Sequence, residues 1–393
     1  MKVVSADIYD VDLSPQGFPR NPIILRLCTD EGIYGVGELA LAYGTGSRAG
    51  MGMLEQMVER FVIGADPTRI EGIWHTLFRR TFWGQGGGPV VYGGISAIDE
   101  ALWDIKGKIL GLPVCELLGG KTNDVIRVYA NGWSNLRDEE GKPRCNTPRE
   151  YARAAQSLVE QGYDAFKFDP FYIRADGVQE MPPRVLPRER ADLAYERVAA
   201  VRQAVGPDVD ILIEVHGNLG TTAAIEMGRR FVELDPFFYE EPVHAMNVEC
   251  MRKVAENVPL PIAAGERLYT RYGFREYIEE QAVDILQPDL GLAGGITEVK
   301  KIAAFAETYD MFVQPHHCAG PISTAASVQL DACITNFIIQ EWRPFAHAAL
   351  YDLVEEALDL QAVDGRFTVP EVPGLGVVLN EEVIGQYPHV HIE

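Results

Sequence analysis

Short apolar segments that each end in an ionisable residue recur along the second half of the chain. Seven of these segments end at the following residues: Lys167, Glu214, Glu240, Glu266, Asp289, His316 and Glu341. The residue numbers give intervals of 47, 26, 26, 23, 27 and 25 positions. The nearly constant interval after Glu214 predicts a repeated strand–helix unit, in which the polar residues collect at one end of the strands.

Eight apolar, strand-like segments follow this repeat, and eight parallel strands are enough to close a barrel. Their sequences are IRVYANGW, DAFKFDPF, VDILIEVHGN, PFFYEEPV, LPIAAGERL, VDILQPDLG, MFVQPHHC and FIIQEW. Amphipathic helical patterns separate them, for example RERADLAYERVAAVRQAVG and GGITEVKKIAAFAETYD. The carboxyl ends of barrel strands meet at one mouth, where barrel enzymes carry their chemistry.

Three carboxylates at successive strand ends predict a site for a divalent cation. These residues are Glu214, Glu240 and Glu266. Oxygen ligands favour a hard ion, with Mg²⁺ first and Mn²⁺ as a possible substitute. Because side chains alternate along a strand, only one of each neighbouring pair, Glu240 or Glu241 and His316 or His317, can face the mouth.

Two further spacings predict groups that move protons. Glu214 and His216 are two positions apart and so point the same way on one strand, as do Lys167 and Asp169. Asp289 ends the sixth strand and a histidine ends the seventh. An aspartate that accepts a hydrogen bond from the far ring nitrogen would orient the imidazole and raise its basicity, as a general base requires.

The first 120 residues or so have a different order of predicted strands and helices. Two strand patterns, VVSADIYDVDL and IILRLCTDEGIYGVGE, precede helical patterns around MLEQMVERFVI and SAIDEALWDIKGKILG. Strand and turn composition returns near the end, in GRFTVPEVPGLGVVLN. We therefore expect an α+β capping domain of residues 1–122, with residues 366–393 packing back on it, and a barrel of residues 123–365.

The composition limits the possible partners. The 393-residue chain carries a formal charge of −22, which argues against nucleic acid and anionic membranes. Six cysteines are scattered without paired spacing, so they predict neither a zinc site nor disulfides. No signal peptide and no long apolar run is visible, and we expect a cytoplasmic protein. An anionic small substrate would need local positive charge, such as a metal ion.

The motifs together resemble the enolase superfamily, specifically its mandelate racemase subgroup. The resemblance spans nearly the whole chain, through GVGE, ALWDIKGK and GLPVCELLGG in the first part and EEP, GERL, ILQPDLGLAGGITE and PHHCAGP in the barrel. The set VYANGW, KFDPF, ILIEVHGN, EEPVH and GERL is most similar to the acid-sugar dehydratases of the gluconate and galactonate type.

This resemblance implies a modified (β/α)₇β TIM-type barrel under the cap, and a homo-oligomer that binds a small sugar acid. It implies that Mg²⁺ is held by Glu214, Glu240 and Glu266. It also selects Glu240 rather than the following glutamate, and His316 rather than the following histidine. The implied reaction is Mg²⁺-dependent dehydration of an aldonic or aldaric acid to a 2-keto-3-deoxy acid through an enediolate.

The resemblance also implies roles for individual side chains. His316 with Asp289 would remove the proton at C2, and His216 would protonate the departing C3 hydroxyl. Glu341 would stabilise the substrate carboxylate region of the enediolate. Lys167 would bind substrate oxygen or serve as an auxiliary base, and the other residue expected to bind substrate is Asp169.

The chain departs from the subgroup at two positions. Glu214 stands where aspartate is usual, and Lys167-x-Asp169 stands where the racemases have Lys-x-Lys. The alternative function is a racemase, epimerase or cycloisomerase, because His216 and His316 could pass one proton between the two faces of C2. Cap segments PQGFPRNP and LAYGTGSRAG are expected to set substrate length, and Tyr43, Trp83, Trp133 and Trp342 are candidate substrate contacts. Cys318 and the GQGGGP loop receive no chemical role.

Overall fold

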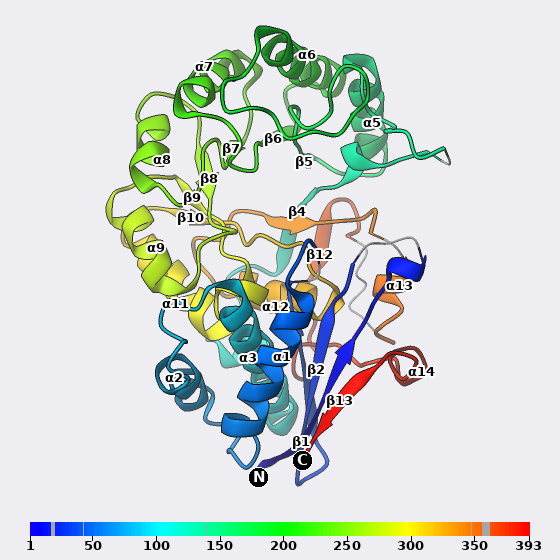
Figure 1. The fold of residues 1–393 in the computed structure, drawn as a ribbon, viewed down its shortest axis with the longest axis vertical. Helices are drawn as coiled ribbons and strands as arrows, with labels where there is room; N and C mark the ends of the chain where they lie inside the picture. Colours follow the sequence, from blue (N-terminus) through cyan, green and yellow to red (C-terminus); the bar gives the residue numbers. More distant parts are fainter. Residues whose placement is uncertain (17–19, 42, 139, 347, 356–361) are drawn as a thin grey trace.

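The computed structural model describes residues 1–16, 20–41, 43–138, 140–346, 348–355 and 362–393. Two units are visible, a smaller one built on an antiparallel sheet and a larger one in which helices surround a parallel sheet (Figure 1). No helix in these ranges has the length and the apolar character needed to cross a membrane.

Eight parallel strands form most of the larger, nine-stranded sheet, in the spatial order β10-β9-β8-β7-β6-β5-β4-β11. The strands are β4 (Val125–Ala130), β5 (Ala165–Phe168), β6 (Asp210–Glu214), β7 (Phe238–Glu240), β8 (Ile262–Ala264), β9 (Ile285–Leu286), β10 (Phe312–Val313) and β11 (Gln340–Trp342). Val313 of β10 also exchanges backbone hydrogen bonds with Asn336 and Ile338, just before β11, and so closes the ring. The predicted TIM-type fold with a cap is confirmed.

Helices cover the outside of this ring (Figure 1). They are α5 (Pro148–Glu160), α6 (Arg188–Val205), α7 (Thr221–Phe231), α8 (Val248–Ala255), α9 (Thr270–Glu279), α11 (Gly295–Glu307) and α12 (Pro321–Asp331). The short α10 (Leu290–Ala293) follows β9 at the carboxyl end of the strands and packs against the smaller unit. The helix α5 starts at a capping box, in which Thr147 and Glu150 each bond the other's backbone N–H. Shorter helical turns are η3 (Trp133–Asn135), η4 (Val232–Leu234) and α13 (Ala348–Tyr351).

The barrel interior is layered because strand side chains alternate. One buried apolar cluster contains Ala165, Leu212, Phe238 and Ile339, each exactly two positions before one of the polar strand-end residues. Those residues, Lys167, Glu214, Glu240 and Glu341, therefore form a polar layer above an apolar floor. The apolar floor excludes water from below and leaves the mouth as the open side.

The smaller unit is a four-stranded antiparallel sheet in the order β13-β1-β2-β3. Its elements are β1 (Val3–Asp10), η1 (Ser14–Gln16), β2 (Ile23–Thr29), β3 (Tyr34–Leu39), α1 (Ser47–Met57), η2 (Val58–Val62), α2 (Ile70–Arg80), α3 (Gly88–Leu110), α4 (Val114–Leu117), α14 (Glu381–Ile384) and β13 (His389–Ile392). Of these, η1, α2, α4 and α14 were not predicted as helices. The long α3 ends at Gly111 in a left-handed conformation, as its sequence suggests.

The C-terminal tail divides between the two units. β13 pairs antiparallel with β1, so the two ends of the chain lie side by side (Figure 1). β12 (Arg366–Thr368), which was expected to pack on the cap, instead pairs with β4 of the barrel. The reason is local packing, since Phe367 lies against Trp342 with ring centroids 5.0 Å apart and Arg366 forms an ion pair with Asp164.

Cap side chains join the two units by accepting backbone N–H groups at the starts of barrel helices. Glu38 accepts from Gly320 (2.6 Å) and Ser323 (3.2 Å) at the start of α12. Near the start of α11, Asp99 accepts from Thr297 (2.9 Å). The first N–H groups of a helix have no partner within the helix, so these carboxylates supply the missing acceptors.

Replacing Glu38 by glutamine should lower the melting temperature by several degrees. The amide would face two buried N–H donors with only one oxygen, and an unsatisfied buried donor destabilises by roughly 1–3 kcal/mol. Thermal unfolding followed by circular dichroism measures this. Glu371→Gln is the matched control, because that side chain is 82% exposed and should leave the melting temperature unchanged. Equal melting temperatures for both variants would contradict the proposed anchoring.

Candidate active site

A cavity of about 660 Å³ opens at the barrel mouth beneath the cap. Seven of the residues singled out from the sequence line it: Lys167, Asp169, Glu214, His216, Glu266, His316 and Glu341. The remaining two, Glu240 and Asp289, are buried and contact side chains of the lining, namely Lys167 and His316. The structure thus brings all nine into one connected group.

His316 is held between carboxylates on both sides of its ring. Its Nδ1 lies 2.7 Å from Asp289, and its Nε2 lies 2.9 Å from Glu266. Burial favours the neutral ring, but the charges of Glu341 and Glu266, together with the hydrogen bond to Asp289, outweigh burial and raise the pKa of His316 well above its ordinary value. Asp289 thus fixes the orientation of the imidazole, as a general base requires.

His216 has a corresponding partner, which the sequence did not reveal. Its Nδ1 lies 3.1 Å from Asp169 Oδ2, while Asp169 Oδ1 accepts backbone N–H groups from Phe171 and Tyr172. Burial opposes the charged ring, but Glu214 and Asp169 outweigh it and raise the pKa of His216 to about 10. The charged imidazolium is the form that donates a proton. The His216 side chain is 41% exposed and that of His316 is 4% exposed.

His216 reaches the cavity for a different reason from the predicted one. The strand β6 ends at Glu214, and His216 lies beyond it in a left-handed conformation with φ of 53°. Such a conformation is strained for a residue other than glycine and persists where surrounding bonds impose it. Here the N–H groups of Val215 and His216 both donate to Glu214 Oε1, at 2.8 and 2.6 Å.

Lys167 is the cation at the centre of the polar layer. Its Nζ lies 2.7 Å from Glu240, 3.2 Å from Glu214 and 3.6 Å from Glu341. Burial would raise the pKa of Glu214, but His216 and Lys167 lower it to about 2. Burial and the charge of Glu214 instead hold the pKa of Glu240 well above its usual range. One ammonium therefore faces more carboxylate charge than it can neutralise.

That excess of buried carboxylate fits a bound divalent cation. Glu214, Glu240 and Glu266 offer only oxygen, the donor that Mg²⁺ prefers. Ligand atoms of His316, Cys318 and Glu341 also lie within 4.8 Å of one another. This second group suits a softer metal, and it would use a ring that already bonds Asp289 and Glu266, so the three glutamates are the better match to Mg²⁺.

In the pairs Glu240–Glu241 and His316–His317, the second residue of each pair has structural contacts. Glu241 accepts from Arg267 Nε at 3.1 Å, while Glu240 contacts Lys167. His317 Nε2 lies 2.8 Å from Thr324 Oγ1, and its backbone N–H donates to Glu341. Burial lowers the pKa of His317 to about 3, so this ring is neutral.

Several lining residues had no predicted role, namely Cys318, Asn131 and Arg343. Arg20 and Tyr43 also line the cavity, and they belong to the two cap segments that were expected to set substrate length, of which residues 17–19 and 42 lie outside the described ranges. Trp133 and Trp342 are buried in the barrel wall instead, and Trp83 is 68% exposed. Arg20 and Arg343 belong to connecting segments, where the strand repeat gives no information.

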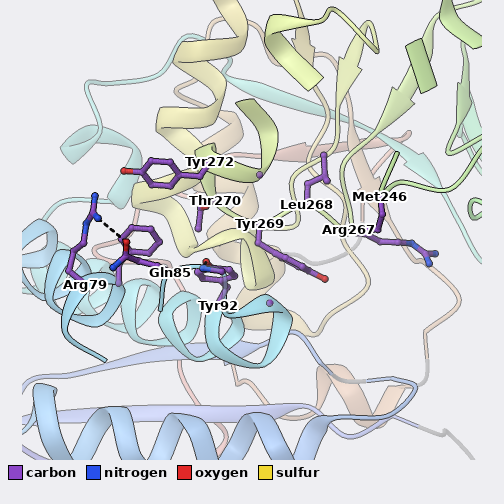
Figure 2. A pocket seen from close by; sticks show the side chains of 13 residues that line it. Arg79, Gln85, Tyr92, Met246, Arg267, Leu268, Tyr269, Thr270 and Tyr272 are labelled. Carbon is purple, nitrogen blue, oxygen red and sulfur yellow. Dashed lines mark hydrogen bonds between the residues drawn. The ribbon is translucent and has the colours of Figure 1, made fainter. Parts of the chain in front are cut away.

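A second cavity, of about 500 Å³, adjoins the first between the cap and α9 (Figure 2). Arg267 and Tyr269 line both cavities. On the cap side, Gln85 accepts from Arg79 at 3.0 Å, and the hydroxyl of Tyr92 accepts from the N–H of Gly86 at 2.8 Å. The GQGGGP loop is therefore tied to the cap beside this second cavity.

Comparison with known proteins places this arrangement in a family. Residues 150–383 match the family model described as enolase C-terminal domain-like. Residues 19–119 match the N-terminal domain of mandelate racemase and muconate lactonizing enzyme. The chain belongs to the enolase superfamily.

Relatives within the superfamily define the class further. A D-galactonate dehydratase of Variovorax paradoxus (strain S110) is 40% identical, over 92% of this chain and 90% of the relative. A second protein of that name, from Ralstonia pickettii (strain 12J), is 37% identical over 95% and 92%. A crystal structure of an enolase superfamily member from Salmonella Typhimurium matches with a TM-score of 0.94, 41% identity and full coverage of both chains. These relatives confirm the expected enzyme class, a sugar-acid dehydratase.

Replacing Asp169 by asparagine should lower kcat by roughly tenfold to a hundredfold. The amide cannot stabilise the imidazolium of His216 as a carboxylate does, and a positioned acid or base contributes about 10²- to 10⁴-fold. Steady-state kinetics on a turned-over sugar acid measures the change. Asp176→Asn, on the same segment with its side chain 51% exposed, is the control. An unchanged kcat for Asp169→Asn would show that the pair is only structural.

Proposed function

We propose that this protein dehydrates an aldonic or aldaric acid to a 2-keto-3-deoxy acid in a Mg²⁺-dependent reaction. The observation that supports this most directly is the pair of imidazoles, each bonded through Nδ1 to its own aspartate and both lining one cavity. Loss of water from a sugar acid needs one group to take the C2 proton and another to protonate the leaving hydroxyl. The D-galactonate dehydratases among the relatives support the same class of substrate.

His316 is the proposed base. Asp289 holds its Nδ1, which leaves Nε2 directed at the strand-end carboxylates. Carboxylates favour the charged form of both rings, so the difference in exposure divides the roles, and the more exposed His216 is the proposed acid. Its greater exposure suits a group that releases water toward the mouth.

Lys167 and Glu341 act on the carboxylate end of the substrate. Lys167 is positively charged and reaches Glu240, Glu214 and Glu341, so a substrate carboxylate can replace one of these partners. Glu341 is fixed by Asn131 at 2.5 Å and by the N–H of His317 at 2.8 Å. Asp169 would act through His216 as well as by binding substrate, because its contacts hold that ring in place.

Glu214, Glu240 and Glu266 would hold the Mg²⁺ ion. When bound, Mg²⁺ supplies positive charge that stabilises the negative charge developing on the substrate carboxylate. Glu214 is longer by one methylene than the usual aspartate, and its Oε1 is already held by two backbone N–H groups. Those hydrogen bonds fold the longer side chain back, which leaves Oε2 to face Lys167 and the cavity.

The second candidate is a racemase or epimerase, which the two similar histidine–aspartate pairs favour. Two imidazoles can take a proton from one face of C2 and return it to the other. The residue that distinguishes the functions is His216, since dehydration needs it only after the C2 proton has left.

Substitutions of the two histidines should therefore abolish different steps of the reaction. In D₂O with Mg²⁺, His316→Asn should lose both ketone formation and C2 deuterium exchange, while His216→Asn should lose ketone formation and retain exchange. A carbonyl reagent and NMR of recovered sugar acid measure the two. His75→Asn, at an exposed histidine of the cap, controls for loss of a ring. Exchange without ketone in the unmodified enzyme, for every aldonic and aldaric acid, would favour epimerisation and reject dehydration.

Removal of the metal should abolish turnover, with a loss of at least about a hundredfold that Mg²⁺ restores. Glu240→Gln should raise the Mg²⁺ concentration needed for half-maximal activity, because it removes one proposed ligand. Glu241→Gln is the matched control and should leave that Mg²⁺ concentration unchanged. Activity that survives exhaustive chelation, with elemental analysis showing no residual metal, would reject the three-glutamate site.

A further inference from the structure

One wall of the active-site cavity carries two guanidinium groups that the proposed chemistry does not use. Arg20 comes from the cap and donates from Nη1 to the backbone oxygen of Cys318 at 3.1 Å. Its guanidinium lies over the ring of Tyr43, 4.4 Å from the centroid. Arg343 lies one residue beyond β11, two positions after Glu341, and lines the same cavity.

The two cations lie close enough to influence each other. Burial, and after it the charge of Arg343, lower the pKa of Arg20. Both arginines also contribute to the low pKa of the buried His317, after burial itself. The positive wall therefore lies beside the 316–318 segment, at the junction of cap and barrel.

Arg343 differs from the other cations of the cavity. Lys167 and Arg267 are neutralised by Glu240 and Glu241, at 2.7 and 3.1 Å. Within the described ranges, no carboxylate lies within 4.0 Å of the Arg343 guanidinium. In a chain with a net charge of −22, an arginine that faces a cavity without a carboxylate is a ready partner for an anionic ligand.

We propose that Arg343, with Arg20 beside it, binds a second anionic group at the far end of the substrate, so that the preferred substrates are aldaric acids rather than aldonic acids. This inference rests on the proposed function and narrows its substrate class. The reacting carboxylate would lie at Lys167 and the glutamates, and the terminal carboxylate would lie at the arginines. A guanidinium can bind a carboxylate through two parallel hydrogen bonds, whereas the hydroxymethyl end of an aldonic acid offers no charge.

Binding to an inactive enzyme tests the proposal without turnover. Calorimetry on Mg²⁺-loaded His316→Asn should compare galactarate with galactonate and glucarate with gluconate, which differ only at the terminal group. The diacid should bind at least about tenfold more tightly in at least one pair. If this variant does not fold, kcat/KM of the unmodified enzyme for the same pairs gives the same comparison.

Variants of Arg343, and of an exposed arginine as a control, test whether the preference for the diacid arises at Arg343. Adding Arg343→Met to the His316→Asn enzyme should reduce the preference for the diacid to less than about threefold, and adding Arg343→Lys should retain part of that preference. Arg188→Met removes an arginine that is 95% exposed and should leave the preference intact. A parallel loss of affinity for both acids would indicate a structural role and reject the proposal.

The remaining outcomes separate the two proposals. Equal binding of both members in both pairs, or tighter binding of the aldonic acids, would overturn the diacid assignment while dehydration of an aldonic acid still stood. Tighter binding of 6-phosphogluconate than of glucarate would overturn the carboxylate assignment in favour of a terminal phosphate. Preferential diacid binding without any dehydration would reject the proposed function and keep the anion site.

Discussion

The structure depends on the burial of opposite charges at the barrel mouth. Lys167 lies at the centre of the carboxylates of Glu214, Glu240 and Glu341, with each of these side chains at most 5% exposed. Placing charges in a poorly hydrated interior is unfavourable unless partners compensate them, and removal of one partner leaves the other as an uncompensated buried charge. The apolar layer below, the cap above and the fixed order of strand ends together keep these groups at contact distance.

Much of this arrangement follows from the sequence because a parallel barrel is periodic. Lys167, Glu214, Glu240 and Glu341 each follow an apolar residue by two positions, and the alternation of strand side chains turns that pattern into a polar layer. The barrel was predicted from this regularity, whereas the enolase superfamily was predicted from the resemblance of its motifs. The specific roles of the histidines and the metal ligands remain predictions, since they concern chemistry rather than position.

The features that the sequence did not reveal are those that depend on contacts between distant segments. Asp169 was expected at the substrate, but its contact with His216 links two loops 47 positions apart. Arg20 and Arg343 line one cavity only because the cap covers the end of β11. β12 pairs with the barrel rather than with the cap because Phe367 packs against Trp342 and Arg366 forms an ion pair with Asp164. Local composition cannot distinguish two sheet edges of similar character.

The path of the chain through the two units also restricts how the mouth can open. The chain leaves the cap once to enter the barrel and returns after pairing with β4, so the cap is attached at two places. Swinging the whole cap away would bend both connections and would break the bonds of Glu38 and Asp99 to the barrel helices. Small molecules are therefore expected to enter and leave the mouth while the body of the cap stays docked on the barrel.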